Sequence, residues 1–163
     1  MEGRQTRSVI FESIARILEQ SHINIERIPS SDGAKRIVTD LIDLSKNSRH
    51  LYEDLFGHGS TKNINIEDAA SRIFGDEIKW KKIAQSLQFA ACCYTAYKRC
   101  DIVMFAGTVA YHYERFKIQE WIENQGGWKA VLPANRTAIA LGALGAVGAL
   151  AMGGIVYNGM RRN

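Results

Sequence analysis

The side chains best suited to catalysis or metal binding in this sequence are four histidines and three cysteines. His22, His50, His58 and His112 are scattered without the spacing that metal ligands require. The cysteines are odd in number, two are adjacent, and none forms a Cys-x-x-Cys pair, so we expect small core residues in a reducing compartment. Phosphate-loop, dinucleotide-binding, zinc-protease and nucleophile-elbow motifs are missing. We therefore expect no enzyme, no metal and no cofactor.

A second chemical feature is a short basic cluster. Lys79, Lys81 and Lys82 surround Trp80 at the predicted start of a helix. The helix dipole disfavours cations at this end, which favours a functional reason for the cluster. A solvated basic helix start stays open as the alternative.

The net charge of the chain has an uneven origin. The 163 residues carry 21 Lys and Arg against 17 Asp and Glu, a net charge of +4. Residues 1–135 hold all 17 acids and 18 of the bases, and the other bases are Arg136, Arg161 and Arg162. A nearly neutral body lacks the basic face that nucleic-acid binding requires. We therefore expect no nucleic acid among the partners.

The three remaining arginines flank an uncharged stretch of 21 residues, Thr137–Tyr157. As a helix it would span about 31 Å, the thickness of a bilayer core. We therefore expect a C-terminal transmembrane helix, although a helix buried within the protein is the alternative. The N-terminus has no signal peptide, which predicts a cytosolic domain anchored by its tail. The apolar anchor positions include Thr137, Leu141, Leu144, Val147, Leu150, Ile155 and Tyr157.

Helical periodicity runs through almost the whole body of the chain, and no segment alternates as a strand would. We therefore predict an all-α fold. The helix over Lys79–Arg99 is apolar nearly all round, so it should be central and buried. Asp32, Asn65 and Asp101 are suited to start helices. The other predicted helices are Ser8–Ser21, Ala34–Phe56, Ile66–Phe74, Asp101–Lys117, Ile118–Asn124 and Trp128–Leu132.

The segment Glu120–Leu132, EWIENQGGWKAVL, predicts two short helices joined by a sharp bend. Gly126 and Gly127 are suited to a positive φ, which other residues adopt only under strain. We expect Trp128 to pack back from the second helix. The residues by themselves would also fit a plain helix–turn–helix corner.

Four segments resemble those of one protein family. Trp121–Trp128, WIENQGGW, resembles the second homology motif of the B-cell lymphoma 2 (Bcl-2) family of apoptosis regulators. Ile73–Ile83, IFGDEIKWKKI, resembles the first motif. Val9–Leu18 is similar to the amphipathic fourth homology helix, and Ala34–Phe56 stands where the third (BH3) helix belongs. With the tail, the resemblance spans essentially the whole chain.

This resemblance implies a Bcl-2-like helical bundle with a central hydrophobic hairpin at residues 1–135 and a membrane anchor at 136–163. It also implies a hydrophobic surface groove that binds BH3 helices of pro-apoptotic relatives by helix-in-groove recognition. The groove residues that it implies are Leu44, Tyr52, Leu55, Lys79, Lys81, Lys82 and Ile83. The architectural residues that it implies are Trp80, Trp121, Gly126, Gly127 and Trp128.

The sequence also departs from the family pattern. Lys79, Lys81 and Lys82 stand where the family has Asn, Gly and Arg. A lysine keeps the charge that pairs with an Asp of the ligand helix but lacks the bidentate geometry of arginine. The side chain of Lys81 must also swing away from the ligand backbone. We therefore expect a selective or weak groove. Two registers of the BH3-like segment stay open, with Ile37 or Val38 at the family leucine.

These features favour an anti-apoptotic protein that sequesters BH3 helices at the mitochondrial outer membrane or the endoplasmic reticulum. In both registers a bulky residue, Leu41 or Ile42, replaces the small glycine that a pro-death helix needs when a partner grips it. A pro-apoptotic membrane pore former of the same fold is the alternative. An unrelated tail-anchored adaptor is a third reading, and the sequence leaves a homodimer open.

Overall fold

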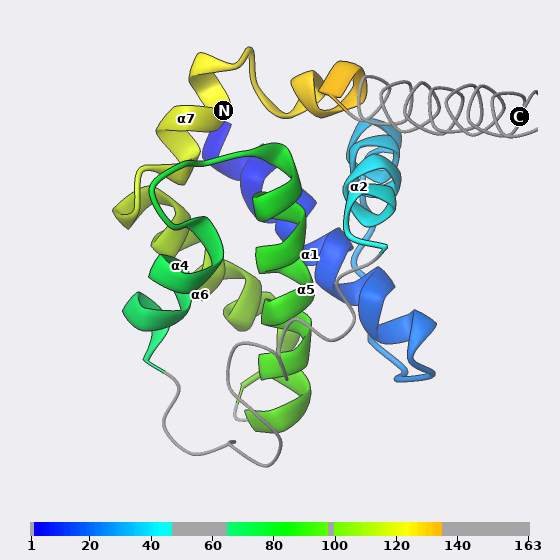
Figure 1. Cartoon of the computed structure of the whole chain (residues 1–163). Helices are drawn as coiled ribbons and strands as arrows, with labels where there is room; N and C mark the ends of the chain where they lie inside the picture. Colours follow the sequence, from blue (N-terminus) through cyan, green and yellow to red (C-terminus); the bar gives the residue numbers. More distant parts are fainter. Residues whose placement is uncertain (1, 47–64, 98–99, 135–163) are drawn as a thin grey trace, which may run out of the picture.

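The computed structural model describes residues 2–46, 65–97 and 100–134, and every regular element within these ranges is helical (Figure 1). The predicted all-α class is therefore confirmed for the described part of the chain. The elements in order are α1 (Glu2–Gln20), α2 (Asp32–Leu44), α4 (Ile66–Phe74), α5 (Trp80–Tyr97), α6 (Ile102–Arg115), α7 (Ile118–Asn124) and the 3₁₀ turn η1 (Trp128–Ala130).

Two predicted capping residues start their helices. Asn65 Oδ1 accepts a hydrogen bond of 2.9 Å from the Glu67 N–H at the start of α4. Asp101 Oδ1 accepts one of 2.9 Å from the Met104 N–H at the start of α6. Each bond satisfies a backbone donor that has no partner inside its helix, so these local signals fix the two starts.

The start of α2 differs from the prediction. Ser31 is the capping residue, and its Oγ accepts a hydrogen bond of 3.2 Å from the Ala34 N–H. Asp32 is the first helical residue, where its carboxylate lies at the positive end of the helix dipole. The assignment of Asp32 as the cap was therefore wrong by one residue.

The end of α2 also differs, because the helix stops at Leu44 rather than continuing to residue 56. Ser45 terminates it: the Ser45 N–H donates to the Leu41 carbonyl, and Ser45 Oγ donates 3.0 Å to the Ile42 carbonyl. This side chain competes with continuation of the helix by bonding to the last turn. Residues 47–56 of the predicted helix lie outside the described residues.

Helix α5 is central, as its apolar sequence predicted. It packs against α1, α2, α4 and α6, and Figure 1 shows α2 and α4 on either side of it. Ile83 and Leu87 of its first half are fully buried. Its last turn is less enclosed, because Thr95 and Ala96 are exposed. The first half of α5 therefore lies in the core, and the neighbouring helices pack against it.

Helix α1 is the most deeply enclosed element of the described residues. It packs against α2, α5 and α6, and Val9, Ile10 and Ile14 have no exposed surface. The helical period over Ser8–Ser21 puts Glu12 opposite the apolar face of this helix, where a charged residue is expected in solvent, yet only 2% of Glu12 is exposed. Ser13 is buried beside it at 1%. Other parts of the protein therefore cover not only the apolar face of α1 but also polar residues that would be expected in solvent.

The Glu12 carboxylate is buried with a full set of donors. Its Oε1 accepts a hydrogen bond of 3.1 Å from Arg16 Nε. Its Oε2 accepts bonds of 2.7 Å from Arg27 Nη1 and 2.8 Å from Ser30 Oγ. Arg27 also binds both carboxylate oxygens of Glu19, at 2.6 and 2.7 Å. This network ties the segment that follows α1 back onto the helix, because burial of a carboxylate requires such partners.

The three cysteines are free thiols, and none is fully buried. Cys92 and Cys93 are half-buried on α5, whereas Cys100 is exposed, so the prediction of a core residue is wrong for Cys100. Burial raises the pKa of the Cys93 thiol to about 12 and also raises the pKa of Cys92. Both α5 thiols therefore stay protonated at neutral pH and are poor nucleophiles.

Among the residues that the structure describes, no helix is long and apolar enough to cross a membrane. The predicted anchor, with Thr137, Leu141, Leu144, Val147, Leu150, Ile155 and Tyr157, lies outside the described residues, as do Tyr52 and Leu55 of the predicted groove.

Candidate functional site

Three tryptophans from distant segments meet in one cluster. The ring centroids of Trp80 and Trp121 are 5.3 Å apart in an edge-to-face arrangement, and those of Trp80 and Trp128 are 6.0 Å apart. These are the spacings at which aromatic pairs attract each other. The cluster joins the start of α5 to α7 and η1, so the two segments quoted for the family resemblance, 73–83 and 121–128, lie against each other.

Trp128 is anchored by hydrogen bonds as well as by packing. Its indole Nε1 donates 3.0 Å to Thr6 Oγ1, and Thr6 Oγ1 in turn donates 2.6 Å to Gln119 Oε1. Trp128 and Thr6 are each only 2% exposed. This chain of bonds links η1, α1 and α7, and it satisfies the polar atoms that burial would otherwise leave unpaired.

The bend before Trp128 has the backbone geometry that its glycines predicted. Gly126 has a φ of +102°, and Gly127 has a φ of +83° with a ψ of −174°. The Gly127 N–H donates to the Ile122 carbonyl at 2.9 Å, which closes the end of α7. The prediction of positive φ at both positions is confirmed, and this bend directs Trp128 back toward Trp80.

Replacement of Gly127 by alanine tests this bend. A Cβ at this position would meet no atom within 4 Å, so the cost is conformational alone. The φ and ψ of Gly127 lie in a region that is essentially restricted to glycine, and we expect a loss of about 1–3 kcal/mol of unfolding free energy. Urea denaturation followed by circular dichroism would measure it.

Gly107→Ala provides the matched control. Gly107 lies inside α6, and a Cβ there also meets no atom within 4 Å. Alanine is the better helix former, so this variant should gain about 0.5–1 kcal/mol. Equal effects of the two substitutions would contradict a special role for the Gly127 backbone.

A surface cleft opens beside the tryptophan cluster. It encloses about 770 Å³. We call it the tryptophan cleft, and its lining residues come from the end of α2, the α4–α5 turn, the start of α5, α7 with the residue that follows it, and the segment after η1. They are Leu44, Asp76, Glu77, Ile78, Lys79, Trp80, Lys81, Trp121, Gln125 and Ala134. The cleft thus combines an apolar wall with a charged edge.

The charged edge contains one ion pair. Lys79 Nζ lies 2.9 Å from Glu77 Oε2, and both side chains are more than half exposed. Lys81 is also exposed, and among the described residues it has no ion-pair partner. Lys79 is therefore partly neutralised by its neighbour, whereas the Lys81 ammonium is available to an acidic ligand.

Lys82 lies close by in sequence but has a different environment. Its Nζ donates 2.5 Å to the Phe74 carbonyl and 3.0 Å to the Glu77 carbonyl. These bonds place a cation at the C-terminus of α4, where the helix dipole is negative. The ammonium expected to face a ligand is thus held by the backbone of the α4–α5 turn, and Ile83 beside it has no exposed surface.

The structure therefore brings together part of the predicted site. Leu44, Lys79 and Lys81 line the tryptophan cleft with Trp80 and Trp121, whereas Lys82 caps α4 and Ile83 is in the core. Sequence reasoning missed several lining residues. Three of them lie in the α4–α5 turn next to the basic cluster and could have been found from that proximity. The other two, Gln125 and Ala134, come from separate segments and carry no local signal. The missed residues are Asp76, Glu77, Ile78, Gln125 and Ala134.

Comparison of the sequence with protein-family models and with curated proteins found no match.

Proposed function

We propose that the chain is an anti-apoptotic Bcl-2-like protein that binds BH3 helices of pro-apoptotic relatives. The observation that carries the proposal is the meeting of Trp80 with Trp121 and Trp128 beside an open cleft. The two segments that resemble the first and second homology motifs supply these residues, and Leu44 ends the helix in the BH3 position. A shared fold of this kind would bring these segments together.

The tryptophan cleft has the chemistry that helix-in-groove recognition requires. Leu44, Ile78 and Trp121 supply partly exposed apolar surface for the anchor side chains of an amphipathic helix. Charged residues at the edge would orient that helix and discriminate among ligands. In this proposal Lys81, rather than Lys82, pairs with the acidic residue of the ligand, because the Lys82 ammonium is engaged by carbonyls.

Titration of the full-length chain against labelled BH3 peptides tests this proposal by fluorescence polarisation. We expect a subset of the peptides to bind, and Lys81→Glu to weaken that binding about fivefold. An exposed ion pair contributes up to about 1 kcal/mol, which corresponds to this factor. Lys129→Glu makes the same change of charge at an exposed residue outside the cleft and should leave affinity unchanged.

Two outcomes would overturn the proposal. If no BH3 peptide binds, the proposed groove function is wrong. If Lys81→Glu and Lys129→Glu weaken peptide binding equally, the affinity depends on the net charge of the protein and not on the cleft. The direction of the activity needs a separate experiment in mammalian cells under a death stimulus. Protection is expected, and release of cytochrome c would instead favour the pore former. Location of the full chain at mitochondria or endoplasmic reticulum would test the tail anchor in the same cells.

A further inference from the structure

We propose that Glu77 is a specificity-determining residue of the tryptophan cleft, and that it restricts the ligand to helices with a single acidic side chain on the bound face. This inference rests on the proposed function, because it concerns the ligand of the same cleft. The charged residues that line the cleft are Asp76, Glu77, Lys79 and Lys81. Two carboxylates thus stand beside two ammonium groups, and this edge of the cleft attracts acidic helices less than its lysines alone would.

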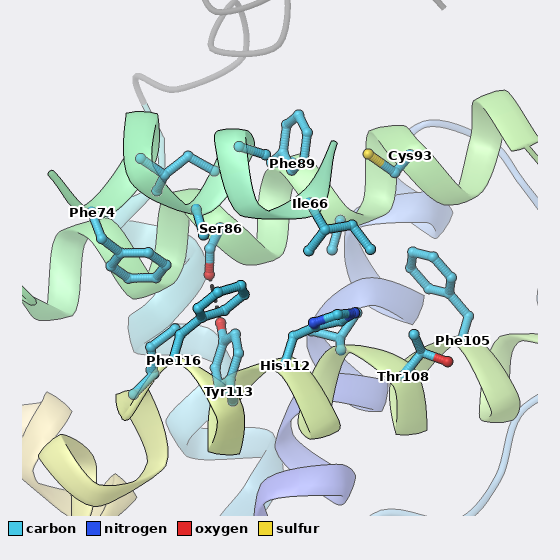
Figure 2. A pocket seen from close by; sticks show the side chains of 16 residues that line it. Ile66, Phe74, Ser86, Phe89, Cys93, Phe105, Thr108, His112, Tyr113 and Phe116 are labelled. Atoms are coloured by element: carbon cyan, nitrogen blue, oxygen red, sulfur yellow. Dashed lines mark hydrogen bonds between the residues drawn. The ribbon is translucent and has the colours of Figure 1, made fainter. Parts of the chain in front are cut away.

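The backbone of Glu77 is held at both of its polar groups. Its N–H donates 3.2 Å to the Phe74 carbonyl, and its carbonyl accepts a bond of 3.0 Å from Lys82 Nζ. Phe74 is only 8% exposed, and Figure 2 shows its ring among the side chains that line an apolar pocket between α4, α5 and α6. The turn that carries Glu77 is therefore anchored to the core, and Glu77 stays at the edge of the cleft.

The Glu77 carboxylate is paired with the cation that follows it in the turn. Lys79 Nζ lies 2.9 Å from Glu77 Oε2. Lys79 directly precedes α5, and its carbonyl accepts a hydrogen bond of 3.0 Å from the Ile83 N–H in the first turn of that helix. A cation is unfavourable at this positive end of a helix, so a carboxylate beside it is stabilising. An acidic ligand that approaches Lys79 must therefore replace Glu77 as its partner.

The other two charges of the edge are not engaged in this way. Asp76 and Lys81 are both exposed, and among the described residues neither has an ion-pair partner. Lys81 is therefore available to one acidic side chain of a ligand helix. A second acid on the same face would meet the carboxylates of Asp76 and Glu77, and like charges across an interface repel each other. The arrangement favours a helix with one acid over a helix with two.

Three related peptides test this selectivity against the full-length chain by fluorescence polarisation. The first is a BH3 peptide that binds and has one acidic residue on its bound face. The second and third have glutamate or glutamine in place of a polar residue three or four positions away, which lies on the same face of a helix. We expect the glutamate peptide to bind about fivefold more weakly than the glutamine peptide, which is the upper limit for one exposed charge pair.

Glu77→Gln should reduce this difference to less than twofold, because it removes one carboxylate and frees Lys79 for the second acid of the ligand. Asp68→Asn is the matched control. Asp68 forms an ion pair of 3.1 Å with Arg72, both side chains are half exposed, and neither lines the cleft. This variant also removes one negative charge from an exposed pair, so the fivefold difference should persist in it.

The outcomes separate this inference from the proposed function. If no BH3 peptide binds, the proposed function is wrong, and Glu77 has no such ligand to select. If the first peptide binds but Glu77→Gln leaves the difference between glutamate and glutamine unchanged, the role of Glu77 is wrong and the groove function stands. The role is also overturned if Asp68→Asn has the same effect, which would indicate net charge, or if Glu77→Gln changes all three affinities by one factor, which would indicate a purely structural effect.

Discussion

Replacement of Trp128 by alanine should lower the free energy of unfolding by about 3–5 kcal/mol, the range for removal of a buried tryptophan from a protein core. Only 2% of Trp128 is exposed. The substitution removes its packing against Trp80 and leaves Thr6 without the indole donor. Urea denaturation monitored by circular dichroism would measure the loss without relying on tryptophan fluorescence.

Trp121→Ala is the matched control for this prediction. Trp121 contacts the same Trp80 ring but is only partly buried and lines the tryptophan cleft. Its truncation removes less buried apolar surface than that of Trp128 and leaves no internal cavity. We therefore expect a loss of about 1–2 kcal/mol of unfolding free energy. A loss below 1 kcal/mol for Trp128→Ala would mean that the cluster contributes little to stability and would remove the architectural role of Trp128.

Replacement of Glu12 by alanine should lower the free energy of unfolding by about 2–3 kcal/mol. The carboxylate is 2% exposed and accepts hydrogen bonds from Arg16, Arg27 and Ser30. Its loss removes several charge-assisted bonds at once, and each is worth more than a neutral one. The expected cost is smaller than for a fully buried ion pair, because 41% of the Arg27 side chain is exposed and retains water.

Glu19→Ala tests whether burial rather than pairing decides the effect. Glu19 binds the same Arg27 through both oxygens, at 2.6 and 2.7 Å, but its side chain is 36% exposed. An exposed ion pair contributes at most about 1 kcal/mol, so this variant should lose less than that. Equal losses in the Glu12 and Glu19 variants, by the same urea measurement, would show that burial of the Glu12 carboxylate adds nothing.

The candidate site was predicted as far as its local signals reached. The spacing of tryptophans and glycines over 121–128 predicted a bend with positive φ and a returning Trp128, and both glycines have that conformation. The bend depends on backbone preferences within a few residues, so the sequence was sufficient for it. Which charged residues face the cleft depended on tertiary contacts, and the assignment of Lys82 to the groove did not anticipate its bonds to the Phe74 and Glu77 carbonyls.

The sequence by itself determined the helical class and the starts of α4 and α6, because periodicity and capping act over one or two turns. Only the tertiary structure decided where the polar side chains go. Glu12 follows the polar face of α1 by periodicity, yet Arg27 and Ser30, more than fourteen residues later, cover it and satisfy its oxygens. His112 Nδ1 of α6 is likewise buried, and among the described residues it has no hydrogen-bond partner. Hydrophobic periodicity predicts which faces are apolar, but burial of a polar group depends on whether the fold brings it a partner.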